Sequence, residues 1–163
     1  MKTFHELQEG LQDPNIFKAF FLAGGPGSGK SFVVGKTTGG TGLKIVNSDD
    51  VFEKYLKDAG FEMDMTTSKA ELQQEPRDKL RDRAKVVTKM KQDNYVDGRL
   101  GLVIDGTGAD YDKIVKQSIE LKQLGYDTHM IYVNTSLDVA LVRNSERERK
   151  VEASIATKSW KDV

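Results

Sequence analysis

The sequence predicts an α/β fold with three layers, in which a parallel β-sheet lies between helices. Short apolar segments, each about the length of one strand, alternate along the chain with longer segments of helical periodicity. A glycine-rich stretch at residues 24–31 directly follows the first apolar segment and precedes a segment that can open a helix. A length of 163 residues suits a single domain over residues 1–163.

Four apolar segments are the expected strands, because each is short and bounded by turn-forming residues. They are residues 17–23, 43–46, 100–105 and 127–133. Capping residues and helical spacing place the helices between them. The expected helices are a short one before Asp13, residues 31–36, 51–59, 76–95 and 111–124, a segment from residue 136, and a short helix that begins at Ser68.

Residues 24–31 carry the pattern Gly-x-x-x-x-Gly-Lys-Ser, which cradles the phosphates of a nucleotide. Successive backbone N–H groups turn inward around the phosphates, and glycine reaches the positive φ angles that this turn needs. Lys30 would contact the β and γ phosphates, and the Ser31 hydroxyl would bind Mg²⁺. The predicted nucleotide-binding residues are Gly24, Gly25, Pro26, Gly27, Ser28, Gly29, Lys30, Ser31, Phe32 and, from the basic run described below, Arg143.

Acidic residues stand at the ends of two other predicted strands. Asp49 and Asp50 follow the second strand, and Asp105 ends the third. In open parallel sheets the ligand crevice lies beyond the carboxyl ends of the strands, so we expect these carboxylates beside the nucleotide. One of Asp49 and Asp50 is the expected base for an acceptor hydroxyl and the other a helix cap; the alternative is that both are caps. Asp105 is the expected Mg²⁺ ligand, directly or through water.

A basic run follows the fourth strand, at residues 143–150. Its cations are Arg143, Arg147, Arg149 and Lys150, and two glutamates lie between them. Because guanidinium groups bind phosphate oxygens bidentately, we expect a mobile lid over the γ phosphate, with Arg147 or Arg149 as the catalytic clamp. An ordinary charged helix is the alternative.

The connection at residues 60–99 is expected to carry substrate-specific structure, because functional variety in α/β enzymes lies in connections. Its long helix carries Arg77, Arg81, Lys85 and Lys89 at i, i+4 spacing. A solvated face with ion pairs along the helix is the default interpretation of this basic row. An anion-binding surface is the alternative.

Composition argues against several kinds of site. The chain has no cysteine and only two histidines, which excludes thiolate sites and makes a zinc enzyme unexpected. Lys plus Arg and Asp plus Glu both total 25, so no net charge attracts the chain to nucleic acid. The N-terminus is too polar for a signal peptide, and no apolar run is long enough to span a bilayer. We expect a cytoplasmic monomer that contacts no membrane, with nucleic acid as a less favoured partner.

Taken together, these motifs resemble the zeta toxin-like P-loop kinases, a group that bacteriophages also encode. The resemblance rests on the phosphate loop, the strand-end run 47–49, the turn 104–107 and the arginine run 143–149, and it covers residues 20–149. It implies a parallel sheet of five strands in the order 2-3-1-4-5, ATP with Mg²⁺ as the donor, and phosphorylation of a hydroxyl.

The sequence departs from that family's pattern at three places. The family's second strand ends in Asp-Gly-Asp, whose second Asp is the base; here the run is Asn47-Ser48-Asp49, so the resemblance gives this role to Asp49, with Asp50 in reserve. Glu53 stands near the position of a family arginine, and the third-strand acid, often Glu, is Asp105. These departures argue against the toxins' nucleotide-sugar substrate. Such kinases also continue into a fifth strand, so for a chain ending after a helix-like segment at 151–163 we expect shortening or a four-stranded core.

The favoured function is therefore a kinase that transfers the γ phosphate of ATP to a hydroxyl of a small-molecule or nucleotide-type acceptor. A polynucleotide 5′-hydroxyl kinase is the alternative within the same chemistry, with the basic row as a local track for nucleic acid. A non-catalytic, nucleotide-dependent binding module is the alternative of another class, and it would need no acceptor base.

Overall fold

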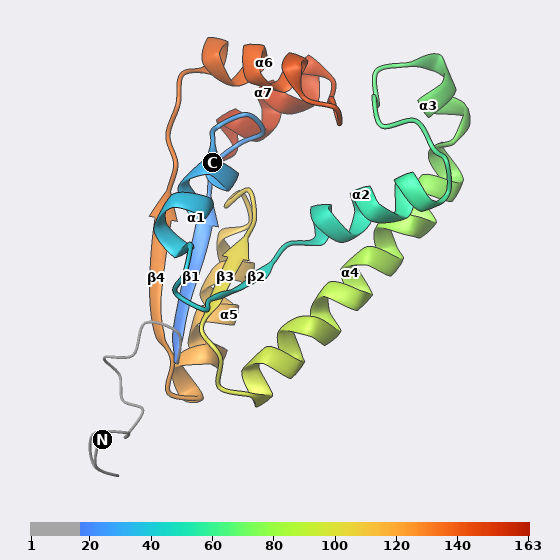
Figure 1. The fold of residues 1–163 in the computed structure, drawn as a ribbon. Coiled ribbons are helices and arrows are strands. Elements are labelled where there is room, and N and C mark those ends of the chain that lie inside the picture. Colours follow the sequence, from blue (N-terminus) through green and yellow to red (C-terminus); the bar gives the residue numbers. More distant parts are fainter. Residues whose placement is uncertain (1–16) are drawn as a thin grey trace.

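The computed structural model describes residues 17–163 as a sheet with helices on both faces and a helical extension at one side (Figure 1). In chain order the elements are β1 (Lys18–Ala23), α1 (Lys30–Thr38), β2 (Lys44–Val46), α2 (Ser48–Asp58), α3 (Ser68–Leu72), α4 (Gln74–Asp97), β3 (Leu102–Asp105), α5 (Tyr111–Gln123), β4 (Asp127–Tyr132), α6 (Leu137–Glu146) and α7 (Ala153–Lys161). The helix predicted before Asp13 lies outside the described residues.

The strands form one parallel sheet in the order β2-β3-β1-β4. This arrangement confirms the predicted α/β fold and the first four places of the expected strand order. A fifth strand does not occur within residues 17–163. The register sets Leu22 of β1 beside Asp105 of β3 and Ile131 of β4. The carboxyl ends of these strands therefore meet at one edge of the sheet, together with the loops that follow them.

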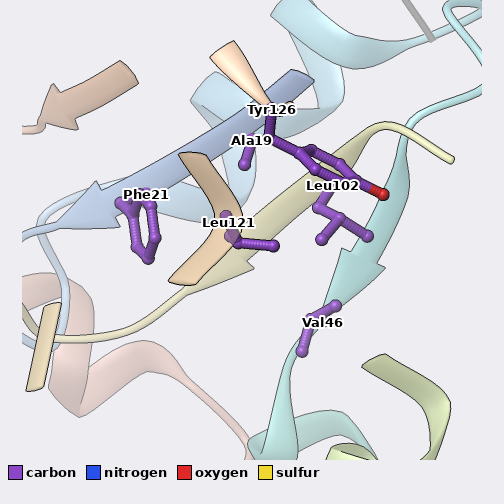
Figure 2. Packing of buried hydrophobic residues seen from close by; sticks show 6 residues of the cluster. All are labelled: Ala19, Phe21, Val46, Leu102, Leu121 and Tyr126. Carbon is purple, nitrogen blue, oxygen red and sulfur yellow. The ribbon is translucent and has the colours of Figure 1, made fainter. Parts of the chain in front are cut away.

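Helices cover both faces of the sheet, as a three-layer fold requires. Figure 2 shows the larger buried cluster, which contains Ala19, Phe21, Val46, Leu102, Leu121 and Tyr126. Leu22 and Val103 pack instead with Val34 of α1, on the other face. Successive strand residues point to opposite faces, so neighbours such as Phe21 and Leu22 join different layers.

The connection between β2 and β3 forms a pair of helices, α2 and α4, that run side by side away from the sheet (Figure 1). Phe52 and Leu56 of α2 pack against Ala84 of α4, and all three residues are buried. The helical spacing of Leu80, Ala84, Val87 and Met90 predicts an apolar face on α4. This prediction is only partly right, because Met90 is exposed whereas Thr88 is buried. Polar residues occupy part of the buried stripe, which an apolar pattern does not reveal.

Arg77 contradicts the interpretation of the basic row as a uniformly solvated face. The residue is 1% exposed, and its Nη1 donates a hydrogen bond of 2.6 Å to the Glu62 carbonyl oxygen. Burial lowers the pKa of the Arg77 guanidinium. Further along α4 the default interpretation holds, because Lys85 pairs with Asp82 at 3.0 Å.

Candidate active site

The loop between β1 and α1 has the backbone shape that its glycines predict. Gly24, Gly27 and Gly29 have φ angles of 151°, 79° and 100°, in the region that favours glycine. Helix α1 begins at Lys30 without a side-chain cap. The amides that open a helix have no partner within it, so they and the positive end of the helix dipole can bind phosphate. Phe32, also predicted as a nucleotide contact, is exposed on α1.

Two C-terminal helices support this loop from outside. A Cβ on Gly27 would lie 2.2 Å from the Ala140 carbonyl oxygen of α6, and a Cβ on Gly25 would lie 3.2 Å from Trp160 Cα of α7. The Trp160 indole donates a hydrogen bond of 2.8 Å to the Thr135 carbonyl oxygen. The loop is therefore packed against α6 and α7, so closely at Gly27 that the position has no room for a side chain.

The Lys30 ammonium lies across the loop. Its Nζ donates to two loop carbonyl oxygens, one of them that of Gly25 at 3.3 Å. Burial lowers the pKa of Lys30, the carboxylates of Asp105 and Asp49 oppose this shift, and Arg147 adds to it. These interactions mean that acids from the ends of β2 and β3, and one lid arginine, lie within electrostatic range of Lys30.

Asn47 joins the ends of β2 and β3. Its Nδ2 donates hydrogen bonds to Asp105 Oδ2 at 3.1 Å and to Asp50 Oδ1 at 3.2 Å. Its Oδ1 accepts a hydrogen bond of 2.8 Å from the Asp49 amide, which makes Asn47 the N-cap of α2. The prediction that Asp49 or Asp50 caps this helix is therefore wrong, and both carboxylates are left for other roles.

Burial and like charge act on the carboxyl groups at this edge. Burial is the main cause that raises the pKa of Asp105, and nearby carboxylates add to it while Lys30 opposes it. Burial also raises the pKa of Asp50, together with the charges of Glu53 and Asp49. Asp105 Oδ1 is buried and has no hydrogen-bond partner among the described residues. A cation beside that oxygen would satisfy it.

The predicted Mg²⁺ ligands fit an ion that the nucleotide helps to hold. Mg²⁺ keeps several waters and binds through one or two protein oxygens plus substrate phosphates. Ser31 is exposed at the start of α1, and the orphaned Oδ1 of Asp105 is the acidic oxygen that such an ion needs. In the described range 17–163 no three His, Cys, Asp or Glu side chains form a metal cluster.

Arg149 lies against α2, where it holds the predicted base. Its Nη2 is 3.3 Å from Asp49 Oδ1, and its Nη1 is 3.2 Å from Glu53 Oε1. The guanidinium lies 5.6 Å from the Phe52 ring centroid, and the side chain is only 9% exposed. The sequence did not indicate this pairing, because the partners are distant in the chain. Arg147, in contrast, is exposed.

The predicted lid is part helix and part loop, since α6 ends at Glu146 and the remaining residues follow it. Arg143 Nη1 donates a hydrogen bond of 3.4 Å to the Ser28 carbonyl oxygen, which puts this predicted contact beside the phosphate loop. Glu148 pairs with Lys57 of α2 at 3.0 Å. The lid thus contacts the loop on one side and α2 on the other. Its closure over a ligand stays a prediction.

Two cavities lie near these groups. One of about 600 Å³ lies between residues 60–64, which follow α2, and the lid. A cleft of about 380 Å³ lies between α4 and α5 and includes Asp105 in its wall. Residues 24–31 line neither cavity. The smaller cleft is therefore the one that adjoins the strand-end carboxylates.

The parallel sheet in the order β2-β3-β1-β4, with a glycine loop leading from its central strand into a helix, defines a P-loop kinase fold. The family model described as zeta toxin matches residues 5–157. The chain therefore belongs to the zeta toxin family, and the resemblance noted from the motifs is confirmed. A comparison with curated proteins gives no match. None of the helices in residues 17–163 is long and apolar enough to cross a membrane.

Solved structures show the same fold at low sequence identity. A protein of Chloroflexus aurantiacus, named provisionally as a kinase, is 17% identical with a TM-score of 0.60, over 85% of this chain and 69% of that one. A structure from the PezAT toxin-antitoxin system of Streptococcus pneumoniae is 21% identical with a TM-score of 0.59, over 77% and 49%. A structure of AvrRxo1-ORF1 with AvrRxo1-ORF2 is 18% identical with a TM-score of 0.56, over 87% and 46%. The chain spans about half the length of the last two.

Proposed function

We propose that this chain is an ATP-dependent phosphotransferase that moves the γ-phosphoryl group of ATP to a hydroxyl of an acceptor. The observation that carries the proposal is the convergence of three charged groups from three strand ends, Lys30 after β1, Asp49 after β2 and Asp105 on β3. Phosphoryl transfer depends mainly on positioning and on charge stabilisation. A phosphate cradle with carboxylates on one side supplies both.

In the proposed reaction, Asp49 accepts the proton of the acceptor hydroxyl. The acceptor oxygen forms a bond to the γ phosphorus, and the bond from that phosphorus to the β–γ bridging oxygen breaks, so ADP leaves. Lys30 and Arg147 stabilise the negative charge on the transferred group. Ser31 and Asp105 would hold Mg²⁺, which would supply charge neutralisation for the phosphates of ATP.

Asp49 is a better candidate for the base than Asp50. The charge of Asp49 acts on Lys30, whereas Asp50 is not among the groups that shift the Lys30 pKa. The Arg149 guanidinium fixes the Asp49 carboxylate in direction, which a base needs because geometry decides whether proton transfer is efficient.

A track for nucleic acid along α4 has less support. Arg77 is buried, and Lys85 pairs with a carboxylate of its own helix. The basic row therefore offers fewer free cations than its sequence suggests, and affinity for a phosphate backbone depends on the number of such cations.

The test measures transfer of label from γ-labelled ATP to the compounds of a metabolite extract. We expect Lys30→Ala to lose both ATP binding and transfer. Asp49→Asn should keep its ATP affinity but lose transfer by roughly a hundred- to ten-thousandfold, the usual contribution of a general base. Asp58→Asn, at the exposed far end of α2, is the matched control and should behave as the parent chain does. If the parent binds ATP but labels no acceptor, the non-catalytic binding module replaces the kinase.

A further inference from the structure

The cleft between α4 and α5 presents polar side chains from both helices beside the end of β3. Those of α4 are Lys85, Thr88, Lys89 and Gln92, and those of α5 are Lys113 and Gln117. The α4 residues have the spacing i, i+3, i+4 and i+7, so they share one face of the helix. Asp105, the turn after it and Asp110 also line the cleft. We call this site the α4–α5 cleft.

Two buried polar atoms in the wall of the α4–α5 cleft lack a hydrogen-bond partner among residues 17–163. They are Thr88 Oγ1 and Asp105 Oδ1. Thr88 is only 8% exposed, although it lines the cleft. An unsatisfied buried polar group costs about 1–3 kcal/mol, and nearly all such groups in native proteins find a partner. Asp105 Oδ1 is the oxygen assigned above to Mg²⁺, so Thr88 Oγ1 is the atom to which a ligand hydroxyl would supply a partner.

The cleft lining carries three lysines against two carboxylates, Asp105 and Asp110, so its net charge is positive. Lys85 and Lys89 pair with Asp82 and Asp93 of their own helix, and in both pairs the side chains are largely exposed. Exposed ion pairs contribute about 0–1 kcal/mol, so both ammonium groups can turn toward a bound anion at little cost. Lys113 adds the third charge from α5. Lysine ammonium groups are effective point charges for phosphate.

We propose that the α4–α5 cleft binds the acceptor, and that this acceptor is a small hydroxyl compound carrying a phosphate ester. The inference rests on the proposed phosphotransferase function and names its substrate class. The phosphate lies against Lys85, Lys89 and Lys113. One hydroxyl group lies toward Thr88, and the reacting hydroxyl lies toward the end of β2, where Ser48 lines the cleft next to the proposed base Asp49. A volume of about 380 Å³ is close to the lower end for ligand sites, roughly 300–1,000 Å³, and suits a sugar phosphate better than a nucleotide sugar.

The experiment separates the two sites by nuclear magnetic resonance of the full chain. The phosphate loop is first saturated with Mg²⁺ and β,γ-imido-ATP, which cannot donate its phosphate. Glycerol 3-phosphate, ribose 5-phosphate and glucose 6-phosphate are then titrated, each beside its unphosphorylated parent. We expect at least one phosphate to shift the amides of Thr88 and Lys113. Lys89→Met and Lys113→Met should each weaken binding about tenfold, the usual loss of a hydrogen bond to a charged group. Lys116→Met, on α5 but outside the cleft, should change nothing.

Each other outcome has a defined meaning. If none of the phosphates binds, if their effects are confined to the loop amides of Gly27 and Gly29, or if the parent polyols bind equally well, the inference is wrong and the kinase proposal survives. If a single-stranded oligonucleotide binds the cleft more tightly than any sugar phosphate, and salt weakens it steeply, the polynucleotide alternative replaces the small acceptor. If the ATP analogue leaves the Gly27 and Gly29 amides unchanged, the proposed function itself fails, independently of the cleft.

Discussion

Replacing Arg149 by methionine tests whether this arginine anchors the lid to α2. Methionine keeps an apolar stem against Phe52 and removes the charge that pairs with Asp49 and Glu53. Removing one partner of a fully buried ion pair costs about 3–5 kcal/mol. Asp49 and Glu53 are 52% and 33% exposed, so water can solvate them again once the guanidinium is gone. We therefore expect a loss of about 2 kcal/mol in the free energy of unfolding, or about 4–8 °C in Tm for a chain of this size.

Urea unfolding and calorimetry of the ligand-free chain measure this loss. Arg147→Met is the matched control, because Arg147 is an exposed cation of the same lid and should change the free energy of unfolding by less than about 0.5 kcal/mol. A double-mutant cycle with Glu53→Gln should give a coupling of at least about 0.5 kcal/mol. Equal effects of the two arginine substitutions, or no coupling to Glu53, would refute the reasoning.

Other measurements address the phosphate loop and the buried carboxylate. Gly27→Ala would place a Cβ 2.2 Å from a carbonyl oxygen of α6 and should destabilise the chain by about 3 kcal/mol in urea unfolding. Gly35→Ala, where a Cβ meets nothing within 4 Å, should instead stabilise helix α1 by about 0.5–1 kcal/mol. The raised pKa of Asp105 means that stability falls as pH rises from the ordinary range of an aspartate through its folded-state value. Asp105→Asn should therefore match the parent in strong acid and exceed its free energy of unfolding at pH 7; a less stable variant at pH 7 would contradict this sign. Trp160 is the only tryptophan and packs on the loop, so saturating ATP should change its fluorescence, and an unchanged spectrum would count against nucleotide binding there.

Local signals in the sequence were enough to predict the α/β fold and the phosphate loop. The glycine spacing predicted the phosphate loop because the backbone conformation of such a loop depends on the residues within it. The strand order followed from the family resemblance, and the strand-end acids were expected near Lys30 because parallel strands end at one edge of a sheet. Electrostatic coupling of Asp49 and Asp105 with Lys30 agrees with that expectation.

Such local signals did not predict contacts between segments that are distant in the chain. The sequence predicted Asp49 or Asp50 as the cap of α2, whereas the cap is Asn47. The Asn47 side-chain amide also donates a hydrogen bond to Asp105 of β3, a contact between segments that are distant in the chain. Burial of Arg77 depends on the loop whose carbonyl oxygen it meets, and no spacing rule for α4 contains that information. The partners of Arg149 lie on α2, and a basic run alone gives no reason to choose them.

The packing of Gly27 and Gly25 on α6 and α7 has a consequence for affinity. Since α6 and α7 pack on these glycines, the loop takes its final form only when both helices have docked. The entropy cost of ordering the loop then falls in the folding step, so it does not reduce the affinity for a nucleotide. Deleting α7 should therefore weaken ATP binding, even though this deletion keeps every residue that is predicted to contact phosphate.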